Sequence, residues 1–555
     1  MKSTFAVLMT CLITNFSFAT VVGPWDLDEL FKAPKWEKTD TAAKRGMTGI
    51  LYSSIPFNGN PVQVFAYYST PKGVPPKGGW PAVVCVHGGG GTAFDQWVRL
   101  WNDHGYAAIS MDLEGHYPIE ITKGSYRYHS TEKPGPSRVG VFHDFEKPID
   151  QQWYYHAVAQ VILAHSLIRS FPEVNADKIG ITGISWGGTL TSTIMGVDNR
   201  FKFAVPVYGC GFLPGSDGRQ GNAIKPGKHT EVVNTYFDGS AYFKNVTIPT
   251  LWVNGTNDKH FTMPMTQKSS QAVQGPATLR FELEMPHGHG PGWNRKEIYA
   301  FADSIVKDGM PLVQFGKPQV DGDDQATVTY TSSTKVTKAE LLYTLDTTAW
   351  PKRKWQKIPA VISGSTLKAN VPSGAAAFFF SATDERNLTT TSEFYQTSAA
   401  QEGITGQLIP TKLTTEYLPN PVGLQTDKPA FSWQFETKIR DQRQTAYQIL
   451  VASNLTDLNN NRGDLWDSGK VESDRSVNVL YEGAPLQSRQ VCYWKLRTWD
   501  ANGKASGWTK PASFEIAFLK ANDWGAKWIG QKPTDEKRLK LSPLLRKEFT
   551  ADKSV

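Results

Sequence analysis

Residues 180–190 read GITGISWGGTL, and this short stretch decides the fold of the first half of the chain. An apolar run leads into it, and a helical pattern begins at Thr189. Ser185 lies at the junction, with Gly183 and Gly187 two residues away on either side. Glycine adopts backbone conformations that a Cβ would obstruct, so these positions indicate a sharp turn between a strand and a helix. The turn predicts that the Ser185 hydroxyl is exposed instead of packed in a core.

Strand-like and helical patterns alternate on both sides of this stretch, from about residue 45 to residue 310. The strand-like runs are VQVFAYY (62–68), PAVVCVHGG (81–89), YAAISMD (106–112), KIGITGIS (178–185), FAVPVYG (203–209), PTLWVNG (249–255) and TLRFELEM (278–285). They are apolar on both faces near their ends, as central parallel strands should be, and helical runs such as residues 152–169 separate them. The alternation predicts an α/β fold, with a doubly wound, mostly parallel sheet and catalytic groups at the carboxyl ends of its strands.

The pentapeptide GISWG fits the G-x-S-x-G nucleophile elbow, in which a strand leads into the serine and a helix leads out. Ser185 is therefore the predicted nucleophile, and a base must accept its proton. Asp258 follows a later strand end and is the predicted acid, which orients the base. The base is expected on the next loop, MPHGHGPGW (285–293), which holds both His287 and His289. We favour His289, because it lies farther from the strand end and is flanked by glycines that let the loop bend back.

A glycine run, HGGGG (87–91), follows another strand-like run. Backbone N–H groups at the end of a strand can bind the oxyanion of a tetrahedral intermediate. We expect Gly88 and Gly89 to supply one donor and Trp186 the other. His87 is expected to shape this loop.

Substrate contacts are expected from three side chains near these loops, His287, Tyr208 and Trp293. The His-x-His pattern can also chelate a metal, but no cluster of further ligands accompanies it in the sequence. We therefore expect a site that holds no metal and needs no cofactor.

The order Ser185, Asp258, His289 resembles that of the α/β-hydrolases. In particular, GITGISWGG (180–188) and RFKFAVPVYG (200–209) are similar to the branch that contains acetylxylan esterases, dienelactone hydrolases and the hydrolase domains of prolyl oligopeptidases. The resemblance implies a serine esterase that removes acyl groups, above all acetyl groups, through an acyl-enzyme. It departs from the oligopeptidases because no β-propeller precedes the hydrolase pattern.

The sequence changes character after Pro311, where short strand-like runs replace the alternation and no long helix is indicated. Residues 311–400 predict a small β-sandwich of the immunoglobulin or fibronectin type. After a polar linker, residues 413–520 predict a second β-sandwich. Residues 521–555 are expected to begin a further β-domain that is incomplete.

The second β-sandwich resembles the N-terminal fibronectin-like region of bacterial α-L-rhamnosidases. The matching motifs include NPVGLQTDKPAFSWQF (420–435), QTAYQILVAS (444–453), YWKLRTWDANGKASGW (493–508) and DWGAKWIG (523–530). The resemblance implies a substrate that is a rhamnose-containing plant or algal polysaccharide. In that family the catalytic residues lie in a later helical barrel, so no glycosidase activity is expected of this chain.

The first residues predict export. Lys2 precedes an apolar stretch at residues 5–18, and small residues lie near its end, as in a secretory signal peptide. We expect a signal peptide at 1–19, a hydrolase domain at 20–310, a secreted or periplasmic protein, and no membrane-spanning segment.

Composition and cysteines limit the partners. The formal charge of +7 arises from 59 basic and 52 acidic residues without a basic block, which excludes a nucleic-acid footprint. Beyond the signal, Cys85, Cys210 and Cys492 form an odd and widely spaced set, which does not predict a disulfide framework. Nothing in the sequence indicates an oligomeric state.

The favoured function is thus a secreted carbohydrate esterase. A peptidase and a uronic-acid methyl esterase of the same fold are the alternatives among enzymes. A carbohydrate-binding scaffold that lacks catalysis is the alternative from another class, and it would require an incomplete triad.

Overall fold

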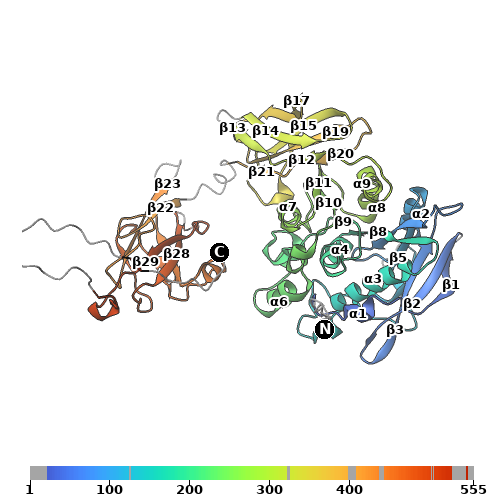
Figure 1. The fold of residues 1–555 in the computed structure, drawn as a ribbon, viewed down its shortest axis with the longest axis horizontal. Coiled ribbons are helices and arrows are strands. Elements are labelled where there is room, and N and C mark those ends of the chain that lie inside the picture. The colour runs from blue at the N-terminus through green and yellow to red at the C-terminus, as the bar shows by residue number, and fades with distance from the viewer. Residues whose placement is uncertain are drawn as a thin grey trace, which may run out of the picture. The chain divides into compact units, whose positions relative to one another are not determined.

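The computed structural model describes residues 22–397, 408–527 and 546–547, apart from residues 45, 124–126, 322–324, 437–442, 502 and 504. The predicted signal peptide at 1–19 and most of the predicted segment 521–555 lie outside these residues. The chain divides into two compact units, Met1–Gly403 and Ile404–Val555 (Figure 1).

One large sheet organises the first unit, in the order β1-β2-β3-β5-β4-β8-β9-β10-β11-β20-β19-β15-β16. The strands of its first part are β1 (Trp36–Lys44), β2 (Met47–Phe57), β3 (Asn60–Ser69), β5 (Ala107–Met111), β4 (Trp80–Val86), β8 (Val174–Ile184), β9 (Ala204–Val207), β10 (Thr250–Gly255) and β11 (Ala277–Glu282). From β5 to β11 every neighbouring pair is parallel, whereas β1 to β3 are antiparallel. The prediction of an α/β fold with a mostly parallel sheet is confirmed.

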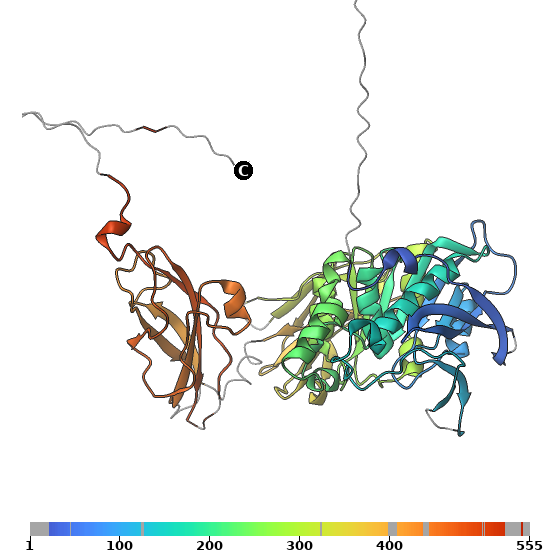
Figure 2. The same ribbon diagram turned by 90° about the horizontal axis from the view of Figure 1, so that it is seen from below.

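Helices cover both faces of the parallel strands, which is why those strands are apolar throughout (Figure 1). The longer helices are α2 (Asp95–Asp103), α3 (Trp153–Arg169), α4 (Trp186–Val197), α7 (Met263–Ala272) and α9 (Lys296–Val306). On one face α2 packs against α9, with the rings of Trp101 and Tyr299 4.7 Å apart. On the other face α3 and α4 are joined by a 2.9 Å hydrogen bond between the hydroxyls of Tyr154 and Thr193. Seen from below, the helices coloured green to cyan lie across the sheet (Figure 2).

Shorter elements complete the loops of this domain. They are the helices α1 (Leu27–Leu30), α5 (Arg219–Asn222), α6 (Lys228–Val232) and α8 (His289–Trp293), and the hairpin of β6 (His116–Glu120) and β7 (Tyr128–Ser130). Parallel strands all end at one edge of a sheet, so the loops that follow β4, β8, β10 and β11 meet there. Those four loops carry the glycine run, Ser185, Asp258 and the two histidines.

The described strands between residues 314 and 396 form two β-layers next to the hydrolase domain. One layer consists of β15 (Val336–Thr344), β16 (Gln356–Pro359), β19 (Ala377–Asp384), β20 (Thr389–Thr391) and β21 (Tyr395–Gln396). The other consists of β12 (Gln314–Phe315), β13 (Gln319–Asp321), β14 (Gln325–Thr331), β17 (Val361–Ser363) and β18 (Thr366–Asn370). Leu279 of β11 pairs with Thr391 of β20, which extends the hydrolase sheet into the sandwich. The described strands of this region therefore belong to the same compact unit as the hydrolase domain.

The second unit has its own core, built around Phe431, Trp433 and Trp494. Its sheets contain β22 (Ile409–Thr415), β23 (Ala430–Glu436) and β27 (Val479–Leu480), and β24 (Ala446–Ala452), β25 (Trp466–Asp467), β26 (Val471–Glu472), β28 (Val491–Trp499) and β29 (Ala512–Glu515). Its short helix is α11 (Leu455–Asn459). The strands form an all-β unit, as the sequence predicts for this region.

Two further observations concern the described residues only. Cys85, Cys210 and Cys492 are buried and carry free thiols. Among the helices of these residues, none combines the length and the apolar character needed to cross a membrane.

Candidate active site

Ser185 lies in a strained turn between β8 and α4. Its φ of 59° and ψ of −117° fall in a region that residues with side chains rarely adopt. The neighbouring glycines permit the turn, because a Cβ at Gly183 would lie 2.0 Å from the carbonyl oxygen of Gly187. A Cβ at Gly187 would lie 1.9 Å from the carbonyl oxygen of Val86 in β4. Only glycine therefore fits at these positions, and the turn presents the Ser185 hydroxyl at the carboxyl edge of the sheet.

His287 joins Ser185 to Asp258. Its Nε2 lies 2.9 Å from Ser185 Oγ, and its Nδ1 lies 2.6 Å from Asp258 Oδ2. This geometry corrects the choice of His289 as the base and also the assignment of His287 to substrate binding. The first histidine after the strand reaches the serine directly, so the extra reach expected of the second is not needed.

Both carboxylate oxygens of Asp258 have fixed hydrogen-bond partners. Its side chain is fully buried, and Oδ1 accepts hydrogen bonds of 2.8 Å from the backbone N–H groups of His260 and Phe261. The remaining oxygen, Oδ2, faces the imidazole of His287. The turn after β10 thus fixes the carboxylate, and the carboxylate fixes the ring of His287.

His289 has a different position, at the first residue of α8. Its Nε2 accepts a 2.9 Å hydrogen bond from the backbone N–H of Gly88, and its ring packs 4.6 Å from that of Phe94. Burial, and then the nearby His87 and His287, lower the pKa of His289 to about 3. It is therefore neutral at physiological pH, with the lone pair of Nε2 engaged by the glycine loop.

The bond to His289 also changes the expected oxyanion site. Because the N–H of Gly88 already donates to an imidazole, it does not point freely into the site. The N–H of Gly89 donates to no acceptor among the described residues. Trp186 is the first residue of α4, where an N–H has no partner within the helix. Gly89 and Trp186 therefore remain as the two available donors, while Gly88 is removed from the predicted set.

His87 shapes the loop, as the sequence suggests. Its Nδ1 lies 2.8 Å from the carbonyl oxygen of Gly88, and its Nε2 accepts a 2.9 Å hydrogen bond from the N–H of Leu113. Both ring nitrogens are thus occupied by backbone groups. His87 anchors the glycine run to the loop after β5.

Two predicted substrate contacts are buried instead. Tyr208 is 0% exposed, packs 4.6 Å from the ring of His287, and donates a 2.7 Å hydrogen bond to the carbonyl oxygen of Pro286. Trp293 is buried against Phe94 and Trp97. Tyr208 supports the loop that carries the base, and Trp293 packs the end of α8 against α2, so neither forms an open pocket wall.

Arg138 is a site residue that sequence reasoning missed. It comes from the segment between β7 and α3, which carries no recognisable motif. Its guanidinium carbon lies 5.6 Å from the ring centre of Trp186, and a Cβ at Gly89 would lie 3.0 Å from its Nη2. The cation therefore borders one of the available oxyanion donors. Only the folded structure brings this loop to the strand ends.

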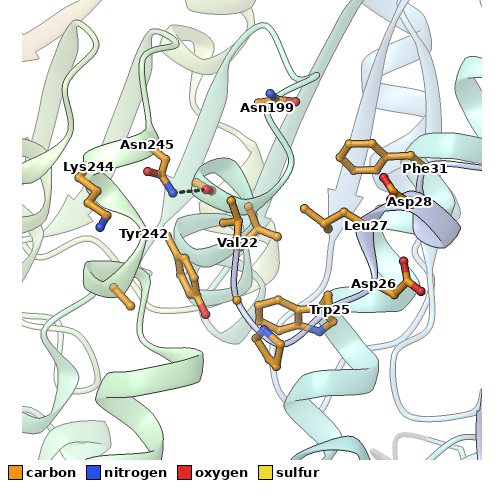
Figure 3. A pocket seen from close by; sticks show the side chains of 15 residues that line it. Val22, Trp25, Asp26, Leu27, Asp28, Phe31, Asn199, Tyr242, Lys244 and Asn245 are labelled. Atoms are coloured by element: carbon orange, nitrogen blue, oxygen red, sulfur yellow. Dashed lines mark hydrogen bonds between the residues drawn. The ribbon is translucent and has the colours of Figure 1, made fainter. Parts of the chain in front are cut away.

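A pocket of about 220 Å³ adjoins the acid and the base, and is lined by Asn257, Asp258, Lys259, His260, Met285 and His287. A wider cleft of about 1150 Å³ lies elsewhere, between the segment that begins at Val22 and the end of α4 (Figure 3). Trp25 and Tyr242 line that cleft, and Asn245 donates a hydrogen bond to Gly196 there. None of Ser185, His287 and Asp258 lines the wider cleft. The size of a cleft alone therefore does not identify the reactive site.

The parallel sheet, the elbow at Ser185 and the serine–histidine–aspartate contacts together define an α/β-hydrolase. Comparison with known proteins agrees. Residues 29–217 match the family model for acetyl xylan esterase (AXE1), and residues 139–305 match that of the prolyl oligopeptidase family. Residues 410–520 match the Rha78A-like N-terminal immunoglobulin domain. The resemblances drawn from the sequence are confirmed, and the first unit has the α/β-hydrolase fold.

Individual relatives match only parts of the chain. An α-L-rhamnosidase of Formosa agariphila is 46% identical over 122 residues, 22% of this chain and 13% of that protein. An α-L-rhamnosidase of Streptomyces avermitilis is 44% identical over 119 residues, 21% of this chain and 11% of that protein. This chain thus spans a small part of the length of these relatives. An acetyl xylan esterase structure from Paenibacillus sp. R4 covers 50% of this chain and 92% of its own, with 20% identity and a TM-score of 0.40.

Proposed function

We propose that the first unit is a serine esterase that removes acyl groups, above all acetyl groups, from a carbohydrate. The observation that carries this proposal is the continuous hydrogen-bonded path from Ser185 Oγ through His287 to Asp258. In the first half-reaction Ser185 Oγ attacks the ester carbonyl carbon while His287 Nε2 accepts the hydroxyl proton. Asp258 stabilises the imidazolium that results.

The carbonyl oxygen becomes an oxyanion, which the N–H groups of Gly89 and Trp186 bind. Collapse of this intermediate breaks the bond to the sugar oxygen, and His287 donates its proton to that leaving oxygen. The product is an acyl-enzyme on Ser185. Water then attacks the acyl carbon, His287 takes a proton from the water, and release of the carboxylic acid returns the proton to Ser185.

The substrate is proposed to be a rhamnose-containing plant or algal polysaccharide. The match of residues 410–520 to a rhamnosidase-type immunoglobulin domain supports this proposal, as does the identity to two α-L-rhamnosidases. The apolar stretch at residues 5–18 supports action outside the cytoplasm, in the periplasm or after secretion. The second unit is then either a spacer or a glycan contact.

Hydrolysis of 4-nitrophenyl acetate and release of acetate from acetylated pectins and xylans test the esterase proposal. Ser185→Ala should lower turnover by at least about 10⁴-fold, because removal of the nucleophile leaves only binding and oxyanion stabilisation. Ser192→Ala, a change of a buried serine on the same helix, is the matched control and should retain most of the activity. Equal rates for wild type and Ser185→Ala would overturn the proposal.

A peptidase is the second candidate, favoured by the match of residues 139–305 to the prolyl oligopeptidase family. A serine–histidine–aspartate triad can cleave amides as well as esters. The esterase and the peptidase proposals therefore differ in which leaving group, an alcohol or an amine, the enzyme prefers. Parallel assays with an acetyl ester and with a short peptide 4-nitroanilide distinguish them. The esterase proposal expects the ester to have a kcat/KM at least about 100-fold higher, and a faster anilide would favour the peptidase.

A further inference from the structure

Arg138 is a cation that lies beside the residues proposed to bind the oxyanion. Its guanidinium lies over the ring of Trp186 and beside Gly89, the two residues whose N–H groups are available for an oxyanion. A Cβ at the adjoining Gly88 would lie 3.0 Å from Cβ of Ser185. With a Cα–Cα step of 3.8 Å, these contacts keep Arg138 Nη2 within roughly 14 Å of Ser185 Oγ.

The guanidinium is only partly used by the protein. Its Nε donates to Glu114 Oε1 at 3.3 Å, and its Nη1 donates to the carbonyl oxygen of Gly140 at 3.2 Å. Within the described residues Nη2 donates to no acceptor, although it is the atom nearest to Gly89. The Arg138 side chain is 23% exposed, so part of it is in contact with solvent.

The surroundings fix this orientation. The indoles of Trp153 and Trp186 lie 6.0 Å and 5.6 Å from the guanidinium carbon. Phe142, on the same loop, packs 5.1 Å from Trp186, so the loop that carries Arg138 is anchored next to it. A planar cation that lies near two indole rings and one carboxylate, and whose Nη2 has no acceptor among the described residues, is preorganised to bind an anion.

We propose that Arg138 is a specificity-determining residue and that the site prefers esters carrying a carboxylate. The inference rests on the proposed esterase function and names its substrate class. A carboxylate matches the fork geometry of guanidinium, and a charge-assisted hydrogen bond is stronger than a neutral one. The carboxylate belongs either to the sugar, as in an acetylated hexuronate, or to the acyl group, as in the monoester of a dicarboxylic acid. Glu114 moderates the preference because it neutralises part of the same cation.

Two matched pairs of esters distinguish the two sources. One pair is a mono-O-acetyl methyl galactoside and the corresponding mono-O-acetyl methyl galacturonate. The other pair is 4-nitrophenyl butyrate and 4-nitrophenyl hydrogen succinate. In wild type, kcat/KM for the anionic member of at least one pair should exceed that of the neutral member by about tenfold or more. Arg138→Gln should lower this ratio by about tenfold, and Glu114→Gln should raise it.

An arginine outside the first unit provides the control for the ratio of kcat/KM between the anionic and neutral esters. Arg462→Gln, an exposed arginine of the second unit, should leave the ratio unchanged. The inference would be overturned if wild type had equal kcat/KM for the anionic and neutral members of both pairs. It would also be overturned if Arg138→Gln lowered kcat/KM for both members of a pair by the same factor. Either result would leave the esterase proposal intact. The second of these outcomes would show that Arg138 only holds its loop.

A binding measurement keeps the inference testable if none of the four esters reacts. In that case the esterase proposal fails, and methyl galacturonate and succinate are titrated into the Ser185→Ala protein, with methyl galactoside as the neutral reference. Binding of either anion that weakens about tenfold in Ser185→Ala/Arg138→Gln supports the anion site. Absence of binding, or binding independent of Arg138, overturns it.

Discussion

At the scale of single residues, the two histidines of the loop after β11 have separate duties. His287 bridges Ser185 and Asp258, whereas His289 accepts the N–H of Gly88 and thereby fixes the glycine loop. The depressed pKa of His289 suits this duty, because a protonated ring offers no lone pair to an N–H donor. His289 is therefore a positioning residue that acts through the backbone of the oxyanion loop.

We predict different kinetic effects for the two histidines. His287→Ala should lower kcat on 4-nitrophenyl acetate by at least about 10⁴-fold, because the nucleophile loses its base. His289→Ala should lower kcat by about 10–100-fold, because one oxyanion donor becomes less well placed. Steady-state kinetics of both variants provide the measurement, and a loss at His289 as large as that at His287 would contradict this division of roles.

The sequence predicted Ser185 and Asp258 because both follow strand ends, where the topology gathers side chains. The choice of His289 over His287 was wrong, because both lie on one short loop and only the path of that loop decides which ring reaches the serine. Tyr208 was misjudged for a related reason, because its side chain turns under the loop to bond Pro286. Arg138 was missed because its loop is brought to the site by tertiary packing alone.

At the scale of elements, the junction of β8 and α4 depends on backbone contacts that leave no space for a methyl group. α4 approaches the end of β4 so closely that Gly187 touches the carbonyl of Val86. Backbone atoms cannot rotate away as a flexible side chain does. The close approach places the N-terminus of α4, with its unpaired N–H groups, beside the glycine loop.

We predict that Gly187→Ala destabilises the first unit by about 3 kcal/mol or more, because the new Cβ overlaps a strand carbonyl. Gly215→Ala is the matched control, since a Cβ there meets nothing within 4 Å, and it should change the free energy of unfolding by less than about 1 kcal/mol. Urea unfolding followed by tryptophan fluorescence measures both. A tolerated Gly187→Ala would mean that α4 can move away from β4.

At the scale of the whole molecule, buried histidines link stability to pH. Burial lowers the pKa of His165, which contacts the buried Asp198, and that of His289. The folded protein therefore resists protonation at these positions, whereas the unfolded chain binds protons below about pH 6.5. Stability conferred by the neutral rings is present above that pH and declines as the solution becomes more acidic.

We predict that the free energy of unfolding falls between pH 7.5 and pH 5, by up to about 1.4 kcal/mol per pH unit for each histidine that takes up its proton only on unfolding. Urea titrations at several pH values measure the slope. His289→Gln should reduce the slope, because one such group is removed. An unchanged slope in this variant would show that His289 is protonated in the folded state.

The pairing of β20 with β11 has a consequence for the solution behaviour of the hydrolase domain. Without residues 311–397, the edge of β11 at Leu279, which now pairs with Thr391, would face water as a template for another chain. The sandwich thus guards the sheet against edge-to-edge association. A truncated form ending near residue 310 should self-associate with rising concentration in sedimentation experiments, while the full chain should not do so through this edge.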